Sequence, residues 1–196
     1  MEKTPYTVYA ESTPNPATMK FVANQLLIGP GFSVELSAED DLSQFPLAAR
    51  MFSFPFINKV FIQDNFIALN KSEEVDWNEV HLELREYITN YLAAGYPVED
   101  KSVQPTQKVI EKNERVMPFG PIEEQIVSIL DEYVKPAVAG DGGAIDFKSF
   151  EDGKLTLQLR GACSGCPSSS MTLKNGIENI FRQMMPSVTE IVAEEV

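Results

Sequence analysis

The two cysteines of the chain, Cys163 and Cys166, are the residues best suited to carry chemistry. They stand three positions apart in the segment GACSGCP, so that two sulfurs can converge on one centre. The glycines of the segment let the backbone pass close to a bulky inorganic ligand. The segment also lies between a predicted strand and a predicted helix. The free N–H groups and positive dipole end of that helix would favour thiolates and an anionic cluster.

Three uses of such a cysteine pair compete, beside an inert structural role. A thioredoxin-like redox pair fits a reducing compartment, but this segment follows a β-hairpin and not the first strand of a βαβ unit. A structural zinc site needs four ligands, and the single histidine, His81, lies in the other predicted domain. An iron–sulfur cluster commonly takes four cysteine thiolates. The spacing alone leaves these uses open.

The number of cysteines bears on the oligomeric state. One chain provides two thiolates, which is half of what tetrahedral zinc or a four-cysteine cluster requires. A symmetric dimer completes the set, because each chain brings two sulfurs to the two-fold axis. A cluster held there is open to solvent from the loop side, which suits release to another protein. We therefore predict a homodimer in the cluster-loaded state.

The composition is that of a globular protein, with 43% hydrophobic and 23% charged residues. Its formal net charge of -13 disfavours phosphate backbones and anionic membrane surfaces, so we expect no nucleic acid and no membrane among the partners. No stretch approaches the roughly 20 apolar residues that span a bilayer. The first residues lack the apolar core of a signal peptide and the arginines of a transit peptide. These features predict a cytoplasmic protein.

The sequence predicts the α+β class, with two small α/β domains joined by a linker. Residues 1–94 form the first domain, the proline-containing stretch 95–120 is the linker, and residues 121–196 form the second domain. In the first domain, Asp64-Asn65 is a favourable hairpin turn, and Asp40 or Ser43 is a candidate cap for a short helix through Met51. Its other elements are strands at 6–11, 18–23, 32–36, 58–63 and 66–70 and a helix at 77–94.

The second domain is predicted to run helix, strand, strand, helix, strand. Its first helix begins at Pro121 and ends at Lys135-Pro136, and residues 140–143 form a flexible glycine loop. The sequence Glu151-Asp152-Gly153 is a hairpin signal between strands 144–150 and 154–160. The second of these strands alternates, with leucines at 155, 157 and 159 on one face. A helix at 168–184 and a strand at 188–193 follow.

Two stretches of this domain resemble a known family. GDGGAIDF and LRGACSGCPSSSMTLKNGIENIF are similar to the C-terminal NifU-like domain of the Nfu family of iron–sulfur carriers, over residues 122–196. TPNPATMKF, within residues 6–94, looks like the Nfu N-terminal domain. The resemblance implies a 4Fe–4S cluster between two subunits, with Cys163 and Cys166 of each chain as ligands. It further implies a carrier, not an enzyme, that takes the cluster from a cluster-donating scaffold and delivers it to apo iron–sulfur client proteins.

One departure from the wider family narrows this function. Longer NifU proteins carry a scaffold domain and a ferredoxin-like domain, each with its own cysteines, and this chain has no further cysteine. Carriage of a finished cluster is therefore favoured over assembly from a cysteine desulfurase. A thiol–disulfide oxidoreductase that uses Cys163 and Cys166 is the alternative function.

Overall fold

The computed structural model describes residues 5–103, 111–112, 120–164 and 167–195. Its contacts divide the chain into two compact units, Met1–Lys112 and Asn113–Val196, called here the N-terminal and C-terminal units. Each unit combines helices with a sheet of its own, which confirms the predicted α+β class. The linker bounds of 95 and 120 stay a prediction, since much of that stretch lies outside the described residues. Two of its residues, Glu111–Lys112, pair with the N-terminal sheet.

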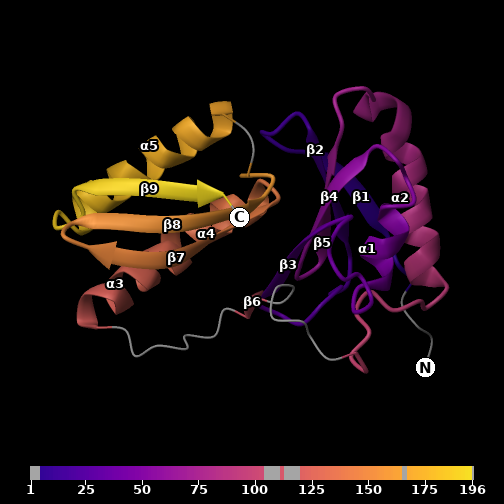
Figure 1. Ribbon diagram of the computed structural model, residues 1–196, viewed down its shortest axis with the longest axis horizontal. Coiled ribbons are helices and arrows are strands. Elements are labelled where there is room, and N and C mark those ends of the chain that lie inside the picture. Colours follow the sequence, from indigo (N-terminus) through magenta and orange to yellow (C-terminus); the bar gives the residue numbers. More distant parts are fainter. Residues whose placement is uncertain (1–4, 104–110, 113–119, 165–166, 196) are drawn as a thin grey trace. The chain divides into compact units, whose positions relative to one another are not determined.

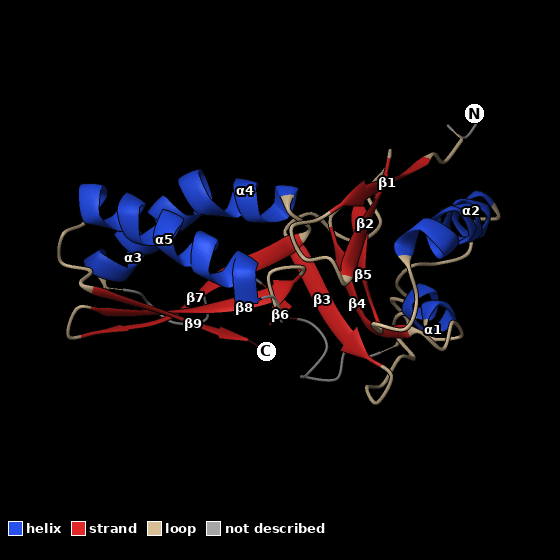
Figure 2. Cartoon of the chain, turned by 90° about the horizontal axis from the view of Figure 1, so that it is seen from above, coloured by secondary structure: helices blue, strands red, loops and turns tan. Residues whose placement is uncertain are grey.

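The N-terminal unit is an antiparallel sheet with two helices on one of its faces (Figures 1 and 2). The strand order is β1-β2-β5-β4-β3-β6, so that the β4–β5 hairpin lies in the middle of the sheet. The elements are β1 (Val8–Ser12), β2 (Thr18–Ala23), β3 (Phe32–Ser37), α1 (Pro46–Met51), β4 (Ile57–Gln63), β5 (Phe66–Lys71), α2 (Trp77–Ala93) and β6 (Glu111–Lys112).

The core of this unit lies between the sheet and the buried face of α2. Leu84, Ile88 and Leu92 recur at intervals of four, which places them on one side of a helix, and all three are buried. They belong to the same apolar cluster as Phe21 of β2, whose ring meets Trp77 edge-on at 6.4 Å between centroids. The helix predicted at 77–94 is thus confirmed to within one residue.

The predicted hairpin at Asp64-Asn65 is also confirmed, because Gln63 of β4 and Phe66 of β5 are register partners. Asp64 has φ +45, a left-handed conformation that aspartate tolerates better than most residues. Its carboxylate accepts a hydrogen bond of 2.9 Å from the backbone N–H of Gly31. This contact ties the hairpin turn to Gly31, the residue directly before β3.

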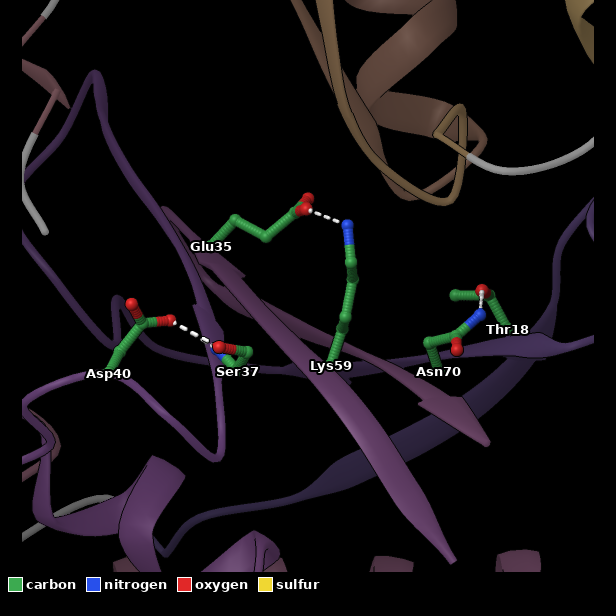
Figure 3. Close-up of polar contacts among 6 residues, drawn as sticks. All are labelled: Thr18, Glu35, Ser37, Asp40, Lys59 and Asn70. Atoms are coloured by element: carbon green, nitrogen blue, oxygen red, sulfur yellow. Dashed lines mark hydrogen bonds and ion pairs between the residues drawn. The ribbon is translucent and has the colours of Figure 1, made fainter. Parts of the chain in front are cut away.

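Polar side chains stabilise the sheet face opposite the core, as Figure 3 shows. Lys59 of β4 forms a 2.8 Å ion pair with Glu35 of β3, and the Asn70 side-chain amide donates to the Thr18 hydroxyl at 3.1 Å. Each pair joins neighbouring strands, and such cross-strand pairs contribute about 0.2–1 kcal/mol each.

The predicted capping of α1 by Asp40 or Ser43 is wrong. The helix begins at Pro46 with Phe45 at the N-cap, and no side chain caps it. Proline suits the first helical position, where its fixed φ helps and its missing N–H costs nothing. The Asp40 carboxylate instead accepts bonds from the backbone N–H and the hydroxyl of Ser37, at 2.6 and 2.7 Å (Figure 3).

The N-cap of α2 gives a first testable prediction. The Asp76 carboxylate accepts the backbone N–H of Asn78 at 2.8 Å, so Asp76→Ala leaves that N–H without its cap. We expect a loss of about 1 kcal/mol in the free energy of unfolding, and Asp76→Asn, which keeps a capping oxygen, should lose much less. Urea denaturation followed by the fluorescence of Trp77 measures both variants. Equal losses in the two would argue against the cap.

The C-terminal unit is a three-stranded sheet whose helices all lie on one face (Figure 2). Strands β7 and β8 are antiparallel, and β9 joins β8 in parallel after the crossover through α5. This confirms the predicted order of helix, strand, strand, helix, strand. The elements are α3 (Pro121–Ile129), the π-helical turn η1 (Leu130–Val134), α4 (Lys135–Gly140), β7 (Gly143–Glu151), β8 (Lys154–Gly161), α5 (Pro167–Met184) and β9 (Glu190–Glu195).

The first helix of this unit does not end at Lys135-Pro136, contrary to the prediction. It continues through η1 into α4, and in η1 the backbone N–H of Lys135 donates to the carbonyl of Leu130, five residues back. Pro136 then lies in the first turn of α4. The wider π turn accommodates a residue that lacks the N–H for a normal helical bond, so the helix runs on to Gly140.

The alternation predicted for β8 is confirmed. Leu155, Leu157 and Leu159 are at most 1% exposed and belong to the core cluster beneath the helices. The facing strand β7 carries an irregularity between Phe147 and Ser149, where the register shifts by one residue. That bulge determines which residues of β7 stand opposite the end of β8.

Candidate functional site

The cysteine loop departs from the end of β8. Gly161 adopts φ +67, which glycine permits without strain, and the backbone N–H of Ser164 donates to the Gly161 carbonyl at 3.1 Å. The resulting tight turn carries Cys163. The second predicted ligand, Cys166, lies outside the described residues. Helix α5 starts at Pro167, directly after it, so both cysteines precede a helix N-terminus as the sequence predicts.

Cys163 faces the interior of the unit. The residue is 5% exposed and belongs to the core cluster that also contains Ile145, Leu159 and Ile177. Its side chain therefore packs as a small apolar group, which is common for cysteine. The position of this sulfur is consequently set by the atoms around it.

The glycine segment 140–143, predicted as a flexible loop, is a two-residue turn. Gly140 is the last residue of α4 and Gly143 is the first of β7, so only Asp141 and Gly142 intervene. The backbone N–H of Asp141 donates to Ala137 at 3.0 Å, and Gly142 has φ +83. Because α4 extends past Pro136, the helix takes up residues that would otherwise form a loop.

This turn lies directly against the cysteine loop. The backbone N–H of Ala162 donates to the carbonyl of Gly142 at 3.1 Å, and Gly143 is the register partner of Gly161. The two glycine-containing motifs of the sequence are thus brought together at the open end of the β7–β8 hairpin. Sequence reasoning did not predict this contact. Counting outward along both strands from the hairpin signal at Glu151 to Gly153 could have indicated that the two motifs lie at the same end of the hairpin, but the bulge in β7 sets the register between them.

Ion pairs fix the strand ends from which the loop departs. Lys135 Nζ lies 2.8 Å from Asp131 Oδ1 and 3.3 Å from Asp146 Oδ1, and the Arg160 guanidinium pairs with the same Asp146 carboxylate. These contacts join η1 and α4 to both strands of the hairpin. Since Arg160 directly precedes Gly161, the network limits movement at the base of the cysteine loop.

The described residues offer no complete metal site. No group of three or more histidine, cysteine, aspartate or glutamate side chains gathers among them. His81 lies on α2 of the other unit, where its Nδ1 contacts the Trp77 carbonyl at 2.7 Å. The donor that the structure does place at the loop is a thiol, the ligand type that iron–sulfur clusters take.

Comparison with known proteins bears on both units. The family model described as the N terminus of scaffold protein Nfu/NifU matches residues 8–95, and the NifU-like domain matches residues 126–192. A human protein, named as the mitochondrial NFU1 iron-sulfur cluster scaffold homolog, is 31% identical over 182 residues. That alignment covers 92% of this chain and 69% of the human protein. The chain belongs to the Nfu family of iron–sulfur cluster proteins.

Another Nfu relative shows how far the likeness extends. The protein of the same name from Drosophila persimilis is 31% identical over 186 residues, which are 94% of this chain and 64% of that protein. The chain thus spans less than two thirds of the length of this relative. Both relatives are named as mitochondrial scaffold proteins.

A solved structure was also similar to part of this Nfu chain. The NMR structure of a NifU-like protein from Saccharomyces cerevisiae aligns with 52% of this chain and 91% of its own, at 27% identity. The TM-score of this alignment is 0.46.

Proposed function

We propose that this Nfu protein carries a 4Fe–4S cluster between two subunits, held by Cys163 and Cys166 of each. The observation that carries the proposal is the position of Cys163, in a tight turn at a strand end, with the second cysteine immediately before α5. A helix N-terminus stabilises thiolates and the negative charge of a cluster. Because one chain has two cysteines, a pair of chains supplies the four thiolates that such a cluster takes.

The presence of two cysteines per chain favours carriage of a finished cluster over assembly of a new one. A cluster held at a two-fold axis can leave when the subunits separate, and this chain has no second set of thiols on which to build another. The protein would receive its cluster from a donating scaffold and deliver it to apo iron–sulfur proteins. Its reaction is ligand exchange at iron, so we propose that it is a carrier and not an enzyme.

Anaerobic reconstitution with iron and sulfide tests the proposal. We expect about four irons and four labile sulfides per dimer, together with a shift from monomer to dimer on gel filtration. Transfer is measured by adding an apo iron–sulfur enzyme and following its activity. A colourless monomer that reduces protein disulfides would instead support the oxidoreductase alternative, and zinc without labile sulfide would indicate a zinc module.

The cellular location stays a prediction. The sequence favours the cytoplasm, whereas the relatives are named as mitochondrial. Among the described residues, no helix is both long and apolar enough to cross a bilayer. The expected absence of nucleic-acid and membrane partners likewise rests on the net charge of -13 alone.

A further inference from the structure

Gly143, the first residue of β7, lies against the sulfur of Cys163. A Cβ atom added to Gly143 would be 2.7 Å from Cys163 Sγ, 3.1 Å from Cys163 Cβ and 2.8 Å from the carbonyl oxygen of Arg160. Non-bonded heavy atoms are at their best separation at roughly 3.5–4.0 Å. No side chain therefore fits at this position as long as the sulfur and the carbonyl stay where they are.

The need for glycine at this position comes from space and not from backbone conformation. Gly142 and Gly161, its neighbours in the chain and across the hairpin, have φ of +83 and +67, whereas Gly143 is not among the residues with positive φ. Its backbone is thus acceptable to alanine, and the obstacle is the three atoms that the new methyl group would meet, two of Cys163 and one of Arg160. This separates Gly143 from the two glycines that shape the turns.

We propose that Gly143 is a positioning residue for the cluster ligand, because the absence of a side chain at Gly143 leaves the space that the Cys163 sulfur occupies. The inference rests on the proposed function, in which that sulfur binds iron. Of the three obstructing atoms, the Arg160 carbonyl oxygen belongs to the paired backbone of β8, and the Cys163 Cβ is fixed to the backbone of the loop. Rotation about the Cα–Cβ bond of Cys163 moves its sulfur, so we expect the sulfur to be the first of these atoms to be displaced.

Alanine substitutions at three glycines test whether Gly143 positions the sulfur. The three substitutions differ in the atoms that lie near the new methyl group. Gly143→Ala meets the sulfur, whereas Gly140→Ala in α4 and Gly176→Ala in α5 meet nothing within 4 Å. Each is combined with Cys166→Ala, so that Cys163 is the only thiol, and its alkylation rate is measured in the native protein. We expect alkylation at least about tenfold faster in the Gly143 variant, because the sulfur is displaced from its buried seat. The other two should stay within about twofold of the parent protein.

Stability measurements keep the test decisive if the Gly143 variant folds poorly. Gly143→Ala is compared in the parent chain and in a Cys163→Ala chain, which lacks the sulfur but keeps the Arg160 carbonyl. If the sulfur is the main obstacle, the fall in Tm is smaller in the Cys163→Ala background, since neighbouring residues couple. Equal falls in both backgrounds, or unchanged alkylation, would overturn the inference.

Cluster binding is the third readout, and it distinguishes the two proposals. With both cysteines present, Gly143→Ala should lose the visible absorption of the reconstituted cluster several-fold faster than Gly140→Ala. If the parent protein itself binds no cluster, the proposed function fails. The alkylation rates and the Tm comparison still decide whether Gly143 seats the Cys163 sulfur.

Discussion

Cys163→Ala should abolish cluster retention while leaving the C-terminal unit folded. In the proposed site, the change removes one ligand from each chain, and therefore two of the four thiolates around the shared cluster. The iron that survives desalting should fall at least about tenfold, and the dimer seen on gel filtration should disappear with it. Cys166→Ala removes the equivalent pair and should give the same result.

The control for this prediction must separate loss of a ligand from loss of stability. Cys163 is buried in the core, so its truncation costs on the order of 1 kcal/mol in the free energy of unfolding. Ile177→Val removes one methylene from the same core cluster, at a similar cost of about 0.5–1.5 kcal/mol, and leaves both thiols in place. It should therefore keep its iron. A Cys163→Ala protein that holds as much iron as the Ile177 variant would contradict the ligand assignment.

Phe181→Ala should produce the largest loss of stability in the C-terminal unit. Phe181 is fully buried on α5, within the cluster that contains Leu155 of β8 and Ile126 of α3. Truncating a buried phenylalanine to alanine costs about 3–5 kcal/mol, through lost burial and the cavity left behind. That is a large share of the roughly 5–15 kcal/mol by which a domain is stable. The variant should also reconstitute poorly, because α5 follows the cysteine loop directly.

Urea unfolding measures this effect, with Met184→Ala on the same helix as the control. The Met184 side chain is 41% exposed, so its truncation should cost less than about 1 kcal/mol. Far-UV circular dichroism follows both units. The fluorescence of Trp77, the single tryptophan, follows the N-terminal core, and the two signals together assign the loss to one unit. A Phe181 variant that unfolds like the Met184 control would contradict the packing of Phe181 in the core cluster.

The sequence was most informative where a pattern repeats within one element. The alternating leucines of β8 and the four-residue spacing of Leu84 and Ile88 on α2 each identify a buried face, because strand and helix periods are local properties of the backbone. The turn at Asp64-Asn65 was predictable for a similar reason, since its conformation depends on the residues in the turn.

The same reasoning failed where packing overrides a local signal. Proline normally ends a helix, yet the π turn at Leu130–Val134 carries the chain past Pro136 and brings Lys135 to Asp146 on β7. The contact between Lys135 and Asp146 does not follow from the residues near the proline, because Asp146 lies on a strand that comes later in the chain. The helix is retained because its buried positions, such as Val134 and Val138, join the core cluster.

For the site itself, the sequence determined the spacing of Cys163 and Cys166, and it predicted thiolate ligands and two chains to complete a four-thiolate set. The tertiary structure decided what surrounds the first sulfur. Counting outward from Glu151 and Lys154 would place Ala144 opposite Gly161, but the bulge between Phe147 and Ser149 shifts the register by one and places Gly143 there. A one-residue shift exchanges the faces of a strand. The bulge therefore decides that a residue without a side chain lies against Cys163.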